Sequence, residues 1–407
     1  MTWSLEPGYR RETLPDPESV GEDADLVAAL RDEIALKGPI SFARFMERAL
    51  YEPGHGYYRR SAPGPGMEGD FLTAPEAHPV YGAALGRLVD EAWTAMGRPN
   101  PFTLTEPGAG TGALAAGLLG GLQNAGSPLG KLVRYRPVEV EPARLAALAA
   151  RLGSAGLDGA LVPDEPAEGP RETGAVIANE VLDALPVHRV VGRAGGLREL
   201  LVTTASDRAF TWLEAEPTTP ALAARLEAEG VTLGDGEITE ICLGIDDWLT
   251  SATRHLKRGV VVLVDYAAEP AVLHGAAKPD GTLRVFARHA VGGDPFRHIG
   301  RQDLTATVDL AAVRTAAAAS GLDLIGETTQ AELLAAAAMP ADGQPGLTDP
   351  WLRGPDATLE TALYLRSALA RLMDPRGMGG FRVLVFGRGL RAELHLPLLD
   401  RVRRTGV

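Results

Sequence analysis

Residues 102–112 read Phe-Thr-Leu-Thr-Glu-Pro-Gly-Ala-Gly-Thr-Gly and carry the strongest structural signal in the chain. The first four residues are apolar or β-branched, which predicts a short buried strand. The alternate glycines that follow predict a tight turn whose backbone a ligand can approach closely. The Ala/Leu-rich run 113–123 then predicts a helix. A strand that passes through a glycine-rich turn into a helix is typical of an α/β sheet with a ligand site at the helix start.

Apolar strands alternate with helices on both sides of this turn, which predicts a parallel, doubly wound sheet. The run GVVVLV at 259–264 is typical of a central strand buried on both faces. The other expected strands are 102–105, 135–140, 174–178, 322–327 and 381–387. The expected helices are two between residues 25 and 50, separated at Gly38-Pro39 with Ser41 capping the second, and then 79–96, 113–123, 142–152, 309–320 and 357–372.

Composition limits the class of protein. The chain has 407 residues, of which 45% are hydrophobic and 23% charged, as in an ordinary globular protein. A net charge of −13 argues against nucleic acid as a partner, because binding phosphates requires a basic surface. No uninterrupted apolar run of about 18 residues occurs, so no membrane span is expected.

The cellular setting is predicted from the same composition. One cysteine, Cys242, excludes a disulfide framework, and the acidic N-terminus lacks the apolar core of a signal peptide. A cytoplasmic location is therefore expected. Lysine supplies only four of the 40 basic residues, which together with abundant alanine and glycine indicates a GC-rich bacterial gene. No H-E-x-x-H or comparable motif is present, so no metal is expected.

The glycine turn and Glu106 together point to a cofactor. A dinucleotide-binding turn would have a glycine where this chain has Ala113, and Glu106 is poorly placed beside a pyrophosphate. Glu106 instead suits a ligand that carries an ammonium and a carboxylate together, such as the methionyl part of S-adenosylmethionine. The carboxylate would meet the N–H groups of the turn, while the ammonium would meet Glu106.

Two acids follow the next expected strand. An acid at the end of that strand can accept hydrogen bonds from the ribose hydroxyls of a nucleoside, and Glu139 is the first candidate. Glu141 lies two residues further on and could take its place. For either residue alone, a solvated acid after a strand is an equally good explanation.

A third motif, Asn179-Glu180-x-x-Asp183, follows strand 174–178 at the edge where open α/β sheets bind ligands. A helix is expected to start here, which would place Glu180 and Asp183 on one side of its first turn. The two carboxylates could hold a cationic substrate and accept its proton. The competing explanation is helix capping by Asn179 with a favourable acid in the first turn.

The chain resembles the MidA-like S-adenosylmethionine-dependent methyltransferases, a family that includes an arginine methyltransferase of mitochondrial complex I assembly. The resemblance covers roughly residues 36–390 and departs from the family pattern at Ala267, Glu141 and Thr307. The matching blocks are Gly38-Pro39-Ile40-Ser41, Ala49-Leu50-Tyr51-x-Pro53-x-His55-Gly56-Tyr57-Tyr58, Gly69-Asp70-Phe71-x-Thr73-Ala74-Pro75-Glu76, Glu106–Gly112, Val138-Glu139-Val140, Ala178–Val187, Asp265-Tyr266, Asp303–Ala306, Val308-Asp309, Thr329-Gln330 and Met378-Gly379.

This resemblance implies a Rossmann-like α/β fold, a seven-stranded class I methyltransferase sheet with an N-terminal helical cap and an inserted substrate subdomain. Together with the polar composition of residues 1–24 and the two segments that break the strand–helix alternation, it predicts a loose arm at 1–24, a helical cap and cofactor-covering loop at 25–98, a methyltransferase domain at 99–390 with insertions near 188–250 and 267–305, and a C-terminal tail at 391–407. The implied cofactor-binding residues, together with those expected from the motifs, are Glu106, Gly108, Gly110, Gly112, Glu139, Asp70, Thr73 and Asn179. Glu180 and Asp183 are the expected catalytic residues, and the expected substrate-binding residues are Glu76, Asp265, Tyr266 and His289.

The function expected from the family is transfer of a methyl group from S-adenosyl-L-methionine to the nitrogen of a protein arginine side chain. Two alternatives stay open: an O- or N-methyltransferase that acts on a small metabolite, and a cofactor-binding assembly factor with little turnover. The expected partners are a protein or small-molecule methyl acceptor and, at most, a second copy of the chain in a homodimer.

Overall fold

The computed structural model describes residues 20–60, 72–164, 169–207, 209–287, 290–292, 294–339, 345–390 and 395–405. Its strands are β1 (Ile40–Ser41), β2 (Phe102–Pro107), β3 (Val133–Val138), β4 (Glu172–Asn179), β5 (His188–Arg193), β6 (Gly196–Thr204), β7 (Phe210–Ala215), β8 (Ile238–Ile241), β9 (Leu256–Asp265), β10 (Ala267–Ala268), β11 (Arg284–Ala287), β12 (Ala290–Gly292), β13 (Asp303–Thr305), β14 (Val308–Asp309), β15 (Asp323–Thr329) and β16 (Arg382–Arg388). Its α-helices are α1 (Ala24–Lys37), α2 (Phe42–Tyr51), α3 (Ala74–Ala77), α4 (Val80–Ala95), α5 (Ala113–Asn124), α6 (Leu129–Leu132), α7 (Pro142–Ser154), α8 (Ala221–Ala228), α9 (Ile245–Ala252), α10 (Pro270–Leu273), α11 (Leu310–Ala319), α12 (Gln330–Ala338), α13 (Asp349–Leu352), α14 (Leu359–Leu372) and α15 (Pro397–Thr405).

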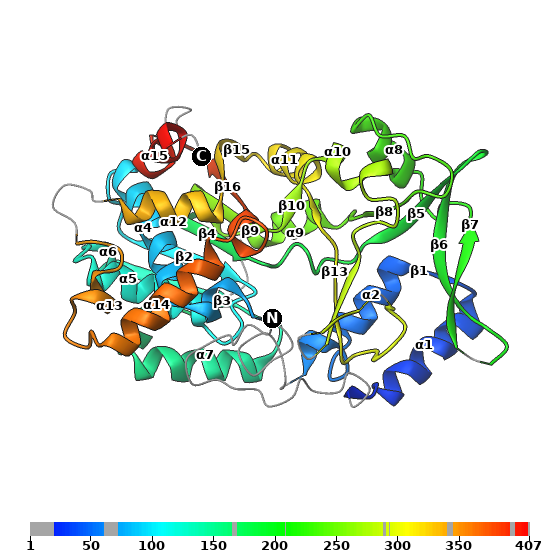
Figure 1. Ribbon diagram of the computed structural model, residues 1–407, viewed down its shortest axis with the longest axis horizontal. Helices are drawn as coiled ribbons and strands as arrows, with labels where there is room; N and C mark the ends of the chain where they lie inside the picture. Colours follow the sequence, from blue (N-terminus) through cyan, green and yellow to red (C-terminus); the bar gives the residue numbers. More distant parts are fainter. Residues whose placement is uncertain are drawn as a thin grey trace.

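The elements form two lobes that lie side by side, one around a large sheet and one around a smaller antiparallel sheet (Figure 1). The large sheet has the order β15-β16-β9-β4-β2-β3. Strands β3, β2, β4 and β9 are parallel, as predicted, whereas β16 runs antiparallel to both of its neighbours. The expectation of a wholly parallel sheet is therefore wrong, because β16 follows the long α12–α14 excursion and enters the sheet from the opposite end.

The α/β expectation is confirmed, but the count of seven strands is not. Six strands form the large sheet in the described part of the chain. Beside the edge strand β3, only an isolated parallel bridge joins Tyr135 to Leu161. The place of a seventh strand is thus marked by one residue pair rather than by a ladder.

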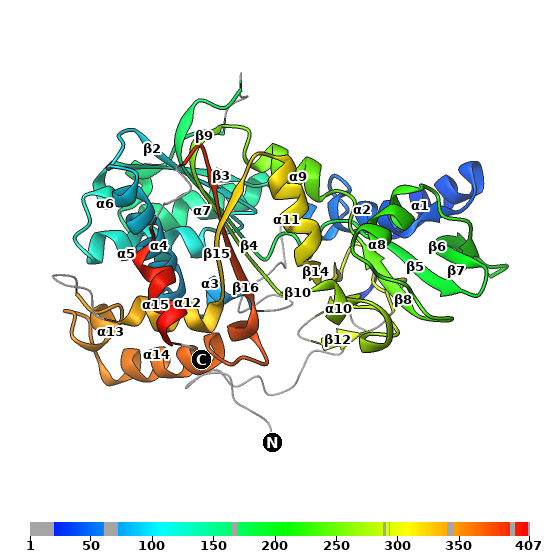
Figure 2. The same ribbon diagram turned by 90° about the horizontal axis from the view of Figure 1, so that it is seen from above.

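Successive side chains of β9 point into two different apolar cores, one on each face of the sheet. This explains why the GVVVLV segment is apolar throughout. Val260, Val262 and Val264 pack into a core with residues of α4, α5 and α12, while Val261 and Leu263 pack into a core with residues of α9 and α11. Figure 2 shows these helices on the two opposite sides of the sheet. Both faces are covered, so every residue from 259 to 264 is buried.

The smaller lobe unites the N-terminal helices with the first insertion. Strand β1 pairs with β6, which also pairs with β5 and β7, and α1 and α2 pack on this sheet through a common core. Ser41 caps α2 as predicted, because its Oγ accepts a hydrogen bond from the Arg44 N–H at 3.1 Å. The second insertion adds a small sheet with the order β12-β11-β13.

The expected unit 25–98 is divided between the lobes. Helices α1 and α2 belong to the small lobe, whereas α4 packs along α5 in the core of the large one. The segment expected as a C-terminal tail contains α15, whose start packs Leu396, Leu398 and Leu399 into the same large core. Much of the arm at 1–24 and part of the covering loop, with Asp70, lie outside the described residues, as does His289.

Among the described residues, no helix combines the length and the apolar character needed to cross a membrane.

Candidate functional site

A cavity of about 420 Å³ lies where the two lobes meet, at the carboxyl ends of β2, β3 and β4. After β3 the chain crosses over β2 to form β4, so the cavity opens at the point where the strand order reverses. Ligands of open α/β sheets bind at this switch point. Nine of the predicted site residues line the cavity, namely Thr73, Glu76, Glu106, Gly108, Gly110, Glu139, Asn179, Glu180 and Asp183.

The glycines of the turn have different local roles. All three have positive φ angles, +71° at Gly108, +53° at Gly110 and +82° at Gly112. A Cβ at Gly108 would lie 2.8 Å from a Val181 methyl group, and one at Gly112 would lie 2.8 Å from Leu148 Cγ. At Gly110 the nearest described atom beyond the two adjoining residues, the Gly108 carbonyl oxygen, would be 4.0 Å away. Gly110 therefore presents an open backbone surface to the cavity, whereas Gly112 caps α5 and lies outside the cavity lining.

Glu106 is buried at the end of β2, with only 5% of its surface exposed. The Tyr135 hydroxyl donates to its Oε2 at 2.7 Å. Burial without a cationic partner raises the pKa of Glu106 to about 8. A cationic group in the cavity would lower this pKa and pair with the resulting carboxylate.

Glu139 lies against the glycine turn. Its Oε2 accepts a hydrogen bond from the Gly110 N–H at 2.9 Å, and its Oε1 accepts from the N–H groups of Val140 and Glu141 at 2.8 and 3.1 Å. Glu141 caps α7 through the Ala143 N–H and does not line the cavity. Of the two acids that the sequence left as alternatives, Glu139 therefore lines the cavity and Glu141 does not.

No helix follows β4, so the predicted helix start at residues 179–183 is wrong. The chain leaves the strand in a turn in which Glu180 has a φ of +52°, a left-handed conformation that is unfavourable for a residue other than glycine. Helix capping by Asn179, the competing explanation, is wrong for the same reason. Asn179 accepts a hydrogen bond from the Tyr81 hydroxyl instead and donates to Glu180 Oε1 at 3.0 Å.

Glu180 and Asp183 are brought to the same wall of the cavity by this turn. Glu180 Oε1 also accepts from the Ala74 N–H at 3.2 Å, and burial raises the pKa of Glu180 to about 7. Asp183 Oδ2 accepts from the Tyr266 hydroxyl, and burial raises the pKa of Asp183 as well. Its Oδ1 is buried without a hydrogen-bond partner among the described residues.

Asp265 and Tyr266 do not line the cavity, in contrast to the expectation that they contact substrate. Asp265 is buried at the end of β9, where its Oδ2 accepts from the N–H groups of Leu182 and Asp183 at 3.0 and 3.2 Å. It therefore holds the 180–184 turn from behind, and the Tyr266 hydroxyl orients Asp183.

The short helix α3 carries the covering segment. Thr73 stands at its N-cap position without a side-chain hydrogen bond, and Glu76 lies in its first turn. Glu76 accepts a hydrogen bond from Thr111 at 3.0 Å and pairs with Arg151 at 3.1 Å. Its carboxylate thus ties the covering segment to the glycine turn and to α7.

Several lining residues were missed by the sequence analysis. Tyr51 and Tyr58 stack at 5.6 Å between ring centroids, and the Arg144 guanidinium lies 5.6 Å from the Tyr58 ring. The Tyr58 hydroxyl donates to both carboxylate oxygens of the buried Asp303 at 2.9 and 3.0 Å. The aromatic run at residues 51–58 was the available signal, but its meeting with residues 144 and 303 depends on the tertiary structure.

The chain is similar in sequence to known proteins. Residues 84–328 match the family model described as "Putative S-adenosyl-L-methionine-dependent methyltransferase". The protein arginine methyltransferase NDUFAF7 homolog of Drosophila melanogaster is 30% identical over 336 residues, which are 75% of this chain and 74% of that protein. The mitochondrial NDUFAF7 of Mus musculus is 27% identical over 328 residues, or 74% and 71% of the two chains.

Solved structures agree with this assignment. A COG1565 superfamily member from Burkholderia thailandensis, bound to S-adenosyl-homocysteine, is 33% identical and superposes with a TM-score of 0.82 over 96% of this chain and 98% of its own. A native structure of a COG1565 superfamily protein from the same organism has a TM-score of 0.80 at the same identity and coverage.

Proposed function

This chain belongs to the family of S-adenosyl-L-methionine-dependent methyltransferases, and we propose that it methylates a nitrogen of a protein arginine side chain. The observation that carries the proposal is the pair of acids, Glu180 and Asp183, on one wall of the cavity. The relatives named as protein arginine methyltransferases support the same acceptor.

The charge of the cavity favours cationic ligands. Among the described lining residues, the acids are Glu76, Glu106, Glu139, Glu180 and Asp183, while the only guanidinium or ammonium is that of Arg144. A low-polarity wall with one sign of charge concentrates ligands of the opposite sign. Both the sulfonium of the cofactor and a guanidinium acceptor satisfy this condition.

The residues of the glycine turn fit the cofactor. The open backbone at Gly110 and the N-terminus of α5 would receive a carboxylate, and Glu106 would pair with an adjacent ammonium. Glu139 is placed to accept hydrogen bonds from ribose hydroxyls, with Thr73 and Asn179 closing the near side. When bound, the cofactor supplies a methyl group on a sulfonium, and transfer of this group to nitrogen leaves a neutral thioether and one surplus proton on the acceptor.

The protein's own contribution is to orient the guanidinium and to receive this proton. The carboxylates of Glu180 and Asp183 can hold the N–H groups of a planar guanidinium, which fixes the direction of the attacking nitrogen. Because the pKa of Glu180 is raised to about 7, its carboxylate can accept a proton near neutral pH. Asp265 and Tyr266 keep these two acids in position.

Methyl-labelled cofactor and cell extract test the acceptor. We expect label in protein, located by mass spectrometry on arginine side chains. Label confined to small molecules would make the protein a metabolite methyltransferase. Cofactor binding without release of S-adenosylhomocysteine would make it an assembly factor.

Glu180→Gln tests the role of the carboxylate. We expect cofactor affinity to stay within about threefold of the wild type, because a 0.6 kcal/mol change corresponds to that factor. Turnover should fall about a hundredfold or more, as is typical when a general base is removed. Glu141→Gln, outside the cavity, is the matched control and should leave turnover unchanged. Equal turnover of the Glu180→Gln variant and the wild type would exclude Glu180, and loss of cofactor binding would make it a cofactor ligand.

A further inference from the structure

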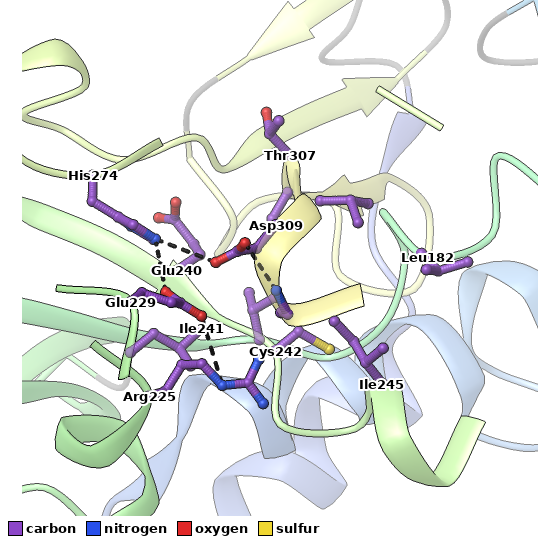
Figure 3. A pocket seen from close by; sticks show the side chains of 14 residues that line it. Leu182, Arg225, Glu229, Glu240, Ile241, Cys242, Ile245, His274, Thr307 and Asp309 are labelled. Atoms are coloured by element: carbon purple, nitrogen blue, oxygen red, sulfur yellow. Dashed lines mark hydrogen bonds and ion pairs between the residues drawn. The ribbon is translucent and has the colours of Figure 1, made fainter. Parts of the chain in front are cut away.

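A second cavity, of about 20 Å³, lies between α8 and α11, and its lining shares no residue with the cavity described above. Three side chains converge on it: Glu229 at the end of α8, His274 just after α10, and Asp309 at the start of α11 (Figure 3). A volume of this size holds one water molecule or one small ion.

His274 is oriented as a ligand. Its side chain is only 3% exposed, and its Nδ1 lies 2.6 Å from Thr239 Oγ1. Nε2 faces Glu229 Oε2 and Asp309 Oδ2, and in the tautomer whose Nδ1–H donates to the Thr239 hydroxyl its lone pair is available to an ion bound between them. A hydrogen bond to the second ring nitrogen is the usual means by which a protein orients a metal-binding histidine.

The two carboxylates each direct one oxygen atom toward His274 Nε2. Glu229 has a side chain that is 6% exposed, and neither of its oxygens has a hydrogen-bond partner among the described residues. The nearest other cation, Arg225 Nε, is 3.8 Å from Oε1. Asp309 uses Oδ1 to cap α11 at the Ala311 and Ala312 N–H groups, while Oδ2 faces His274. Glu229 is thus a buried carboxylate whose ion-pair contacts with Arg225 and His274 are 3.8 and 3.5 Å long, so an ion in the cavity would bind it more closely than these side chains do.

The distances suit a transition-metal ion. His274 Nε2 lies 3.5 Å from Glu229 Oε2 and 3.4 Å from Asp309 Oδ2, and one ligand atom from each residue falls within 4.8 Å of the others. Four ligands held tetrahedrally at about 2.1 Å from a zinc ion are separated by about 3.4 Å. One imidazole and two carboxylates form a donor set that Zn²⁺ accepts, and a water molecule would complete the tetrahedron.

We propose that Glu229, His274 and Asp309 bind one divalent transition-metal ion such as Zn²⁺. The ion would link the inserted lobe to helix α11, which packs on the large sheet. The three ligands come from the first insertion, the second insertion and the first turn of α11, so one ion joins three segments that are distant in sequence. None of the three ligands lines the larger cavity, so the ion has a structural role rather than a part in methyl transfer.

Metal binding by untagged, chelator-treated protein tests the proposal. Titration with Zn²⁺ should show one tight equivalent by calorimetry and by elemental analysis after dialysis, and Zn²⁺ should raise the Tm. Co²⁺ in the same site should give the visible absorption of a tetrahedral complex. His274→Ala should abolish all of these signals, and Glu229→Gln should weaken zinc affinity at least tenfold.

His255→Ala is the matched control, because His255 pairs with the carboxylate of Asp164 at 3.4 Å, away from the three proposed ligands, and its loss should leave zinc binding unchanged. Circular dichroism establishes that each variant is folded. Equal zinc binding by folded wild type and His274→Ala would overturn the proposal. So would wild-type protein that binds no zinc while NMR shows the His274 imidazole protonated at pH 8, since the imidazolium would then supply the positive charge between the carboxylates.

Discussion

Two acids of the larger cavity, Glu106 and Glu180, are buried without a cationic partner among the described residues, and this burial determines how they ionise. Glu106 and Glu180 have their pKa values raised to about 8 and about 7, in both cases mainly because burial disfavours the charged form. Only Glu106 receives a hydrogen bond from a tyrosine, and that bond opposes the rise without cancelling it. The unliganded protein therefore holds Glu106 protonated around neutral pH.

The pKa of Glu106 predicts a pH dependence of stability. Because the folded pKa of about 8 exceeds the ordinary value of 4.5, the folded state binds the extra proton. Its stabilising effect is complete below the ordinary pKa and is lost as the pH rises through about 8. The glutamine of Glu106→Gln does not ionise, so the variant does not lose this stability as the pH rises. Between pH 5 and pH 9, the Tm of the cofactor-free variant should therefore fall by a few degrees less than that of the wild type.

Thermal melts across this pH range, recorded without cofactor, provide the measurement. Glu227→Gln, an exposed acid on α8, is the control and should follow the wild-type curve. Parallel curves for Glu106→Gln and wild type would show that Glu106 is not protonated in the folded state.

At the scale of elements, helices α4 and α5 cross at close range in the large lobe. Gly82 and Gly117 face each other here, and a Cβ at Gly117 would lie 2.8 Å from the Pro79 carbonyl oxygen and 3.2 Å from Gly82 Cα. The helices approach this closely because neither glycine has a side chain. Their contact places the start of α5, and with it the glycine turn, against the sheet.

Two glycines of α5 give a matched pair of substitutions. Gly117→Ala should destabilise the protein by about 1–3 kcal/mol, the usual effect of overpacking, even though alanine favours a helix. Gly120→Ala, where a Cβ would meet no atom within 4 Å, should stabilise it by about 0.4–1 kcal/mol. Urea unfolding measures the free energy of unfolding of the two variants. Equal changes in the two variants would mean that α4 and α5 can move apart to accept the added methyl group at no cost.

At the scale of the whole molecule, the larger cavity takes its walls from both lobes. Tyr51 and Tyr58 come from the small lobe, while the glycine turn and the 179–185 segment come from the large one. A ligand in the cavity therefore contacts both, and its binding energy adds to the stability of the assembled molecule.

S-Adenosylmethionine at 100 times its Kd should stabilise the protein by about 2.7 kcal/mol, which calorimetry and thermal melts can measure. Gly110→Val should abolish this shift, because valine is strained at a φ of +53° and its side chain would occupy the open surface of the turn. NADH is the control ligand and should have no effect. A shift with NADH but none with S-adenosylmethionine would contradict the cofactor assignment.

The sequence by itself determined the α/β class, the glycine turn and the acids that follow the strands. These features are local: the period of apolar residues sets the element type, and the end of a parallel strand places Glu106, Glu139 and Glu180 at one edge of the sheet. Nine of the residues named from sequence therefore line one cavity.

Only the tertiary structure decided which of these acids are partnered and what each one contacts. A helix was predicted to start after β4, where the apolar strand ends, but the backbone of Leu182 and Asp183 is held in a turn by Asp265, which lies more than 80 positions away. The convergence of Tyr58 with Asp303, and of Glu229, His274 and Asp309, likewise depends on segments that meet only after folding. Local periodicity carries no information about such contacts, because they are fixed by the packing of the two insertions against the sheet.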